Sequence, residues 1–201
     1  MGILVISGPS GAGKSSIINA AKPNLGDIHF SVSTTTRAKR EDEVEGVHYN
    51  FVEKESFEKD IKEGNFLEYA KVHDNYYGTA IKPVLDALDQ EKLVIFDIDV
   101  QGHGFVRNRL GDLTTSVFIT PPTLSELKKR LQSRATDSEA IVNKRLENAI
   151  FEIESLNEYD FVIINDDLDK AVEQFINVAK VARLKYSNSE LAAFIKDWNN
   201  L

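Results

Sequence analysis

A glycine-rich octapeptide close to the N-terminus constrains the fold of this chain more than any other stretch of its sequence. Residues 8–15 read GPSGAGKS and fit the phosphate-binding pattern G-x-x-x-x-G-K-[ST] at every required position. An apolar, β-branched run over 3–7 precedes the pattern, and residues 16–21 continue as the start of a helix that must end before Pro23. The sequence therefore predicts a buried strand, a glycine loop and a helix in direct succession.

This succession is suited to binding a polyphosphate. Glycines can adopt positive φ values and turn backbone N–H groups towards an anion, and the helix N-terminus adds partial positive charge. Lys14 is placed to reach the β- and γ-phosphates of a nucleoside triphosphate, and the Ser15 hydroxyl to ligate Mg²⁺. The alternative, a chance occurrence of the pattern, does not account for the flanking strand and helix.

The composition narrows the function classes. At 201 residues, 42% of them hydrophobic, the chain is long enough for one α/β domain with a sizeable core. A net charge of −8 disfavours a broad nucleic-acid-binding surface, and the absence of cysteine excludes disulfides and thiolate chemistry. No signal or transit peptide is recognisable before the first strand, and no apolar run reaches the ~18 residues of a membrane span. We expect a cytoplasmic protein that binds neither membranes nor nucleic acids.

Alternating strand and helix patterns favour a doubly wound α/β fold with a parallel sheet. Apolar runs predict four buried strands and a possible fifth, at 3–7, 93–99, 116–120, 161–165 and 29–34. Ligands of such folds bind at the carboxyl ends of the strands. The polar residues expected at those ends are Ser7, Asp97, Asp99 and Asn165.

Two stretches, 33–80 and 121–145, interrupt this alternation. We interpret them as insertions that cover the phosphate site rather than as separate domains. The second holds two helices, whose starts are predicted by the capping boxes Thr123-x-x-Glu126 and Thr136-x-x-Glu139.

The first insertion contains residues suited to a second anion. Arg37 and Arg40 lie three residues apart after a run of hydroxyl side chains, and Tyr49 follows. Two guanidinium groups and a phenol can hold a dianion. A solvated basic turn fits the same residues, since acidic side chains surround it.

Glu68 is the one acid in an otherwise apolar, aromatic strand. A buried carboxylate needs donors, and a guanine base would supply two, while Ser33 and Thr79 could meet its O6. On these residues alone, an outward-facing, solvated Glu68 is the favoured alternative.

Several motifs, taken together and in order, resemble the guanylate kinase family from Ile3 to about Lys180. They are GPSGAGKS, SVSTTTR-x-x-R, HYNFV, GNFLEYA, NYYGT, DIDVQG, RLQSR-x-x-DSE, KRL and FVIIND. The resemblance implies transfer of the γ-phosphoryl group of ATP to GMP, and to dGMP, with Mg²⁺ as cofactor. It also implies one domain over 1–201 with three parts: a core (1–32, 81–121 and 146–201), a GMP-binding region (33–80) and a lid (122–145).

The resemblance also assigns residues. For ATP it implies Gly8, Pro9, Ser10, Gly11, Ala12, Gly13, Lys14, Ser15, Ser16, Arg134 and Asn165. For the GMP phosphate it implies Arg37, Arg40, Tyr49 and Tyr77, and for the guanine side Ser33, Glu68, Gly78, Thr79 and Asp99. The catalytic residues would be Lys14, Arg37, Arg40, Arg134 and Arg145. A turn residue at the end of a strand is an alternative for Asn165.

The reaction needs charge neutralisation more than acid–base chemistry, because a phosphate acceptor is already an anion. Arg130 and Arg134 share a helix face, and Arg134 and Arg145 can converge on the donor phosphates, although surface ion pairs are the alternative. Asp97 and Asp99 alternate on one predicted strand, which suggests metal ligation by Asp97.

The C-terminal stretch predicts a last helix capped by Ser189. Its apolar residues follow helical spacing at Leu191, Phe194, Ile195 and Trp198. Docking onto the chain's own core is the simpler interpretation, and a homo-oligomer contact is the alternative. Two other functions stay open: a related kinase of another small phosphate, such as a ribose bisphosphate, and a non-catalytic guanylate-kinase-like binding module.

Overall fold

The computed structural model describes residues 2–41, 43–72, 74–133 and 138–199. Its core is a five-stranded sheet with the order β2-β7-β1-β8-β9, in which all neighbouring strands are parallel. The strands are β1 (Gly2–Ser7), β2 (Ile28–Ser31), β7 (Leu93–Asp97), β8 (Thr114–Thr120) and β9 (Phe161–Ile164). The predicted doubly wound α/β fold is confirmed, because the sheet grows outward on both sides of β1.

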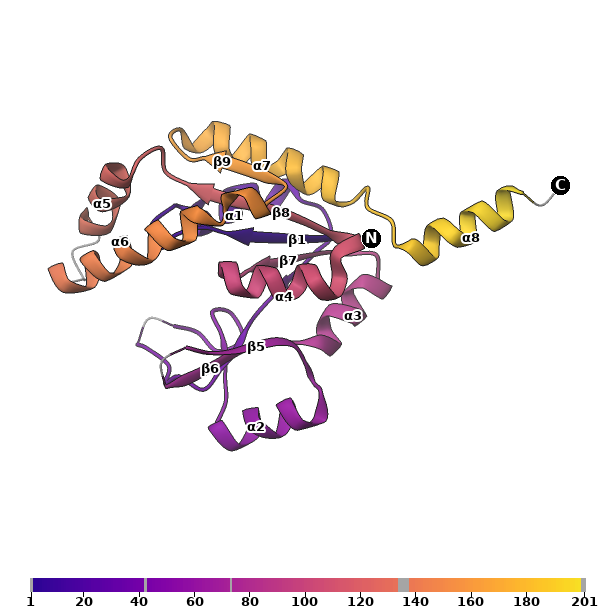
Figure 1. The fold of residues 1–201 in the computed structure, drawn as a ribbon, viewed down its shortest axis with the longest axis horizontal. Coiled ribbons are helices and arrows are strands. Elements are labelled where there is room, and N and C mark those ends of the chain that lie inside the picture. The colour runs from indigo at the N-terminus through magenta and orange to yellow at the C-terminus, as the bar shows by residue number, and fades with distance from the viewer. Residues whose placement is uncertain (1, 42, 73, 134–137, 200–201) are drawn as a thin grey trace.

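Helices cover both faces of this sheet (Figure 1). They are α1 (Lys14–Ala21), α3 (Ile81–Asp89), α4 (Val100–Leu110) and α7 (Leu168–Ala182). Leu4 and Ile6 of β1 belong to the cluster that includes α1 and α7 residues, whereas Ile3 and Val5 belong to the cluster that includes α3 and α4 residues. Every residue of β1 is buried, as expected for a central strand of a covered parallel sheet.

Residues 33–80 contain a second, four-stranded sheet with the order β4-β3-β6-β5. Its elements are β3 (Thr34–Thr35), β4 (Asn50–Phe51), α2 (Lys54–Glu63), β5 (Phe66–Val72) and β6 (Asn75–Ala80). The buried ring of Phe57 in α2 stacks on Phe66 and Tyr76, with ring centroids 4.3 and 5.3 Å apart. The predicted strand 29–34 is wrong as one element, because β2 ends at Ser31 and Thr34 already pairs with β6 in the second sheet.

The stretch after β8 forms two helices, α5 (Leu124–Ser133) and α6 (Glu139–Glu154). Thr123 caps α5, since its Oγ1 accepts from the backbone N–H of Glu126 at 3.1 Å. For α6 the predicted cap at Thr136, a residue outside the described ranges, is wrong. Ser138 is the N-cap residue, and its hydroxyl accepts from the backbone N–H of Ile141.

The last helix, α8 (Asn188–Trp198), extends away from the rest of the molecule (Figure 1). Its cap is Ser187 rather than Ser189, because Ser187 and Glu190 form the complete capping box. No residue of α8 is buried, and Trp198 is 76% exposed, so the expected docking onto the core is wrong. Within the described ranges, no helix is long and apolar enough to cross a membrane.

Candidate functional site

The predicted phosphate-binding loop joins β1 to α1 and borders a cavity of about 390 Å³. Gly8, Gly11 and Gly13 have φ values of 143°, 91° and 92°, which favour glycine. At Gly8 a Cβ atom would also lie 2.0 Å from the carbonyl oxygen of Ile119. Lys14 donates from Nζ to the Gly8 carbonyl oxygen at 2.6 Å, which holds the ammonium group at the loop. The loop residues that line the cavity are Gly8, Pro9, Ser10, Gly11, Gly13, Lys14, Ser15 and Ser16.

Ala12 and Asn165, also predicted to bind the donor nucleotide, do not line this cavity. Ala12 is fully buried, and Asn165 is 6% exposed. The Asn165 side chain donates from Nδ2 to the Ala12 carbonyl oxygen at 2.8 Å. A Cβ atom at Gly13 would lie 2.3 Å from the same amide nitrogen. Asn165 therefore supports the loop from beneath instead of lining the cavity.

Two aspartates face the loop from different elements. Asp97 ends β7 with its Oδ1 3.9 Å from Lys14 Nζ; burial raises the pKa of this carboxyl, and the Lys14 ammonium opposes the shift. The prediction that Asp99 continues the strand is wrong, because β7 ends at Asp97 and Asp99 caps α4. Its Oδ1 accepts from the backbone N–H of Gly102 at 2.8 Å, which satisfies an otherwise unpaired helix donor. Both carboxylates nevertheless line the same cavity.

The oxygen ligands at this cavity suit a metal that arrives with a nucleotide. Among the residues that the structure describes, no group of three or more His, Cys, Asp or Glu side chains could hold a metal ion. Ser15 and Asp97 both line the cavity. Mg²⁺ takes one or two such ligands from a protein when substrate phosphates and water supply the others. The donor set thus fits Mg²⁺ bound together with a triphosphate.

Glu152 of α6 also lines this cavity, although no sequence motif indicated it. Burial raises its pKa, the Lys14 ammonium opposes this shift, and the Asp99 carboxylate adds to it. Glu152 follows Arg145 by seven residues, which places both on one face of the helix. That spacing is the signal that could have identified it.

A second cavity, of about 290 Å³, adjoins the first, because Tyr49, Ile98 and Asp99 line both. Its other lining residues are Ser33, Glu68, Ala70, Tyr77 and Gly102. These residues come from the core and from the second sheet. The folding of 33–80 thus brings most of the predicted guanine-side residues to one place.

Glu68 lines this second cavity, so the solvated alternative is wrong. Its Oε1 accepts from Oγ1 of Thr79 at 2.7 Å, and Thr79 is fully buried on the neighbouring strand β6. Burial raises the pKa of Glu68, the Thr79 hydroxyl opposes the shift, and the Asp99 carboxylate adds to it. Gly78 is buried beside them; a Cβ atom there would lie 3.0 Å from the Glu68 carbonyl oxygen, so glycine lets the two strands approach.

The Glu43 carboxylate forms an ion pair with the guanidinium group of Arg37. Nη2 of Arg37 lies 2.5 Å from Oε1 of Glu43, and Oε2 of Glu43 accepts from the backbone N–H of Arg40 at 2.8 Å. The hydrogen bond from Arg37 lowers the pKa of Glu43 to about 2, and the same contact raises the pKa of Arg37. The guanidinium carbon also lies 5.5 Å from the centroid of the Tyr49 ring. The Glu43 carboxylate therefore binds the Arg37 guanidinium group, which was predicted to bind the GMP phosphate.

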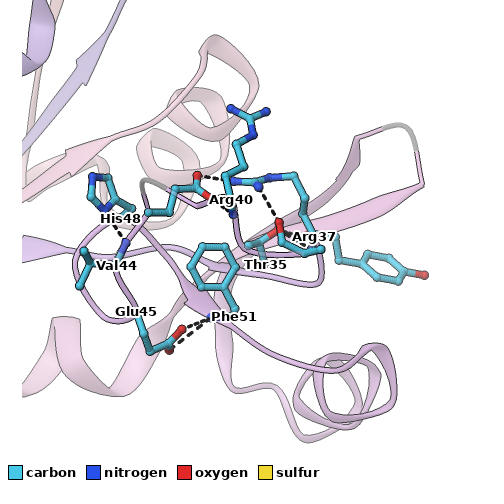
Figure 2. Close-up of polar contacts among 10 residues, drawn as sticks. Thr35, Arg37, Arg40, Val44, Glu45, His48 and Phe51 are labelled. Carbon is cyan, nitrogen blue, oxygen red and sulfur yellow. Dashed lines mark hydrogen bonds and ion pairs between the residues drawn. The ribbon is translucent and has the colours of Figure 1, made fainter.

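The loop that carries these groups is folded by its own side chains (Figure 2). The Val44 N–H donates to Nδ1 of His48 at 3.0 Å, and the Phe51 N–H donates to Oε2 of Glu45 at 3.1 Å. Arg37 is half-buried at one end of this loop, whereas Arg40 is exposed. The alternative of a solvated basic turn is therefore wrong for Arg37.

Two arginines of the stretch that was predicted to form a lid, Arg145 and Arg130, make different contacts. Arg145 reaches the phosphate loop, where its Nη1 donates to Oγ of Ser10 at 3.2 Å. Arg130 instead makes an ion pair along α5, with its Nε 3.0 Å from Oε1 of Glu126. Arg134 lies outside the described residues.

Comparisons with known proteins agree with this geometry. A family model described as guanylate kinase matches residues 1–181. The chain is 55% identical to a guanylate kinase of Sulfurimonas denitrificans over 199 residues, covering 99% of this chain and 97% of that protein. It is 48% identical to a guanylate kinase of Helicobacter pylori over 200 residues, covering 98% and 96%. The crystal structure of guanylate kinase from Anaplasma phagocytophilum matches with a TM-score of 0.73 at 34% identity, covering 91% of this chain and 86% of that one.

Proposed function

This chain belongs to the guanylate kinase family, and we propose that it transfers the γ-phosphoryl group of ATP to GMP, and to dGMP, in purine nucleotide metabolism. The observation that carries the proposal is the pair of adjoining cavities. The phosphate loop borders the first, Glu68 lines the second, and Tyr49 and Asp99 belong to both. A donor and an acceptor bound in the two cavities would meet at this shared wall.

The chemistry requires positioning and charge neutralisation, because the acceptor phosphate is already an anionic nucleophile. Lys14 and the loop N–H groups would bind the donor phosphates. Arg145, which already contacts Ser10, would neutralise charge on the transferring group from the lid side. Arg134 is expected to act with Arg145.

On the acceptor side, the GMP phosphate would compete with Glu43 for the guanidinium group of Arg37. The contact between Arg37 and Glu43 supports this, because carboxylate and phosphate engage a guanidinium fork in the same way. Tyr77 also interacts with Arg37, and the rings of Tyr49 and Tyr77 meet edge to face with centroids 5.9 Å apart. Arg40 would complete the clamp from the same loop.

Mg²⁺ would be held by the Ser15 hydroxyl, with Asp97 beside it. When bound, it would neutralise charge on the donor phosphates. Asp97 also lies near the Lys14 ammonium, and this contact would keep Lys14 oriented towards the loop when no nucleotide is present.

Guanine recognition would depend on Glu68. An ionised carboxylate only accepts hydrogen bonds, and the guanine edge offers the N1–H and the 2-amino group as donors. Thr79 already orients one carboxylate oxygen. Ser33 and Asp99 line the same cavity and would contact the remainder of the base.

The alternatives explain fewer of these features. A kinase of a ribose bisphosphate does not need a carboxylate that is placed to accept hydrogen bonds from the N1–H and 2-amino group of guanine. A non-catalytic binding module has no use for a complete phosphate loop. The test is ADP release with GMP, dGMP, AMP, CMP and UMP as acceptors: turnover with GMP and dGMP alone supports the proposal, and no turnover with GMP contradicts it.

We further propose that the core, the GMP-binding region and the lid move as units, with the boundaries predicted from the sequence, and that the protein acts in the cytoplasm. Closure of 122–145 would exclude water, which competes as an acceptor. An Arg134→Ala variant should lower kcat more than tenfold with an unchanged melting temperature. Normal turnover would contradict the lid assignment.

We also propose that α8 pairs with α8 of a second copy of this chain. An isolated helix of 11 residues is marginal in water, so the apolar face of α8 is expected to need a partner. Antiparallel pairing would bring Glu190, near one end of the helix, towards Lys196 of the second copy. Light scattering of a variant that lacks 187–201 tests this: a dimer that becomes a monomer supports the proposal, and an unchanged oligomeric state contradicts it.

A further inference from the structure

One arginine of the core helix α4 is tied to the strand that carries Glu68. Nη1 of Arg109 donates to the carbonyl oxygen of Leu67 at 2.5 Å and to that of Phe66 at 3.3 Å. Arg109 lies in the last turn of α4, and the two carbonyl groups belong to β5 of the second sheet. In Figure 1, α4 lies between the core sheet and β5. The contact therefore joins the two parts of the site.

The pairing of β5 with β6 is irregular at this point. Phe66 pairs with Ala80 and Glu68 pairs with Thr79, so Leu67 has no partner in the register. Such a bulge bends a strand and interrupts its ladder. Arg109 supplies a donor to the carbonyl groups at the bulge.

The side chain of Leu67 strengthens the same attachment. It is 2% exposed and belongs to a core cluster with Val106, which lies one helical turn before Arg109 on α4. Backbone and side chain of Leu67 are thus both held by one face of α4.

Glu68 follows Leu67 directly, so this attachment lies next to the carboxylate of the second cavity. Successive side chains of a strand alternate between its faces, so a slip of one residue would turn Glu68 away from the cavity. The first turn of α4 is capped by Asp99, which lines the same cavity. One helix therefore contributes Asp99 to this cavity at its start and contacts the strand that carries Glu68 through Arg109 at its end.

We propose that Arg109 is a positioning residue for guanine recognition: it fixes the bulge of β5 that aims Glu68 into the acceptor cavity. The proposal rests on the reading of guanine by Glu68 put forward above. Arg109 itself would not touch the nucleotide.

The test compares three variants by steady-state kinetics and thermal melting. Arg109→Met removes the donors and should raise KM for GMP about tenfold, with kcat and KM for ATP within about twofold of wild type. Arg109→Lys retains the positive charge but replaces the guanidinium group by a shorter ammonium donor, and it should raise KM for GMP about threefold. Arg107→Met is the matched control, because Arg107 donates to the Glu158 carbonyl oxygen and pairs with Asp160 instead. It should leave KM for GMP unchanged.

A double-mutant cycle with Glu68→Gln separates this role from general packing. If Arg109 acts through Glu68, Arg109→Met should change KM for GMP less than about twofold in the Glu68→Gln background. A persistent tenfold effect there, or an unchanged KM for GMP in both Arg109 variants, overturns the proposal. If Arg109→Met does not fold, the same double-mutant cycle is measured with Arg109→Lys and Glu68→Gln. If Glu68→Gln alone leaves KM for GMP unchanged, the proposed guanine reading fails and this proposal falls with it.

Discussion

Replacing Glu68 by glutamine removes the charge of the predicted guanine reader and little else. Thr79 donates to one carboxylate oxygen at 2.7 Å, and glutamine can retain that contact through its carbonyl oxygen. Its amide nitrogen then faces the N1–H and 2-amino donors of the base. Each hydrogen bond to a charged group contributes about 1.5–3 kcal/mol, and relaxation or water recovers part of the loss. We expect a net loss of about 2–4 kcal/mol, or about 30- to 1,000-fold in kcat/KM for GMP.

The assay is coupled ADP release with GMP and with IMP, whose base lacks the 2-amino group. Wild type should have a higher kcat/KM for GMP than for IMP. Glu68→Gln should lower kcat/KM for GMP and should also reduce the ratio of kcat/KM for GMP to that for IMP. Glu58→Gln, on the outer helix α2, is the control and should change neither. A kcat/KM for GMP within about threefold of wild type in Glu68→Gln would show that Glu68 does not recognise guanine.

The same carboxylate gives a pH dependence with a defined sign. Burial raises the pKa of Glu68 above its ordinary value of 4.5, so the accepting, ionised form is lost at a higher pH than for a solvated glutamate. We expect kcat/KM for GMP to fall as the pH is lowered through this raised pKa, with an inflection above 4.5. Glu68→Gln should abolish that inflection. An unaltered pH profile in the variant would assign the titration to another group.

Three further substitutions probe residues at the phosphate loop and in the loop that holds Arg37. Arg145→Met should lower kcat more than tenfold with an unchanged melting temperature, and a normal kcat would exclude it from the transfer step. Gly13→Ala should lower stability by about 1–3 kcal/mol and raise KM for ATP, because φ is 92° and the new Cβ meets Asn165 at 2.3 Å; wild-type urea unfolding would contradict this. Glu43→Gln should lower stability by about 1 kcal/mol at pH 7, because Arg37 loses its charged partner. The depressed pKa of Glu43, about 2, means that this contribution is present above about pH 4.5 and is lost as the pH falls towards 2, so the two urea midpoints should converge in acid.

The phosphate loop could be predicted from the sequence because its conformation depends on neighbouring residues. Gly8, Gly11 and Gly13 are required by local φ values, and Lys14 contacts the carbonyl oxygen of Gly8 only six residues away. The orientation of Glu68 could not be predicted in this way. It depends on a bulge in β5 and on Arg109, 42 residues from Leu67 in the sequence.

Other differences arise where two local structures compete for the same residues. The apolar Ile98 makes 93–99 look like one strand, but the Asp99 carboxylate satisfies a helix N–H and the strand ends at Asp97. The sequence did not indicate Glu43 as the partner of Arg37, because acidic side chains near a basic turn are ordinarily solvated. Glu43 is instead held within the loop, with only 11% of its side chain exposed.

We propose that the two adjoining cavities form one continuous site for a donor and an acceptor. Isothermal titration calorimetry with a bisubstrate compound, adenosine and guanosine joined through five phosphates, is the decisive measurement. We expect one compound bound per chain, with a Kd about 100-fold or more below that of ATP or GMP alone, because one linked molecule would fill both cavities. Binding no tighter than ATP alone, or two compounds bound per chain, would contradict it.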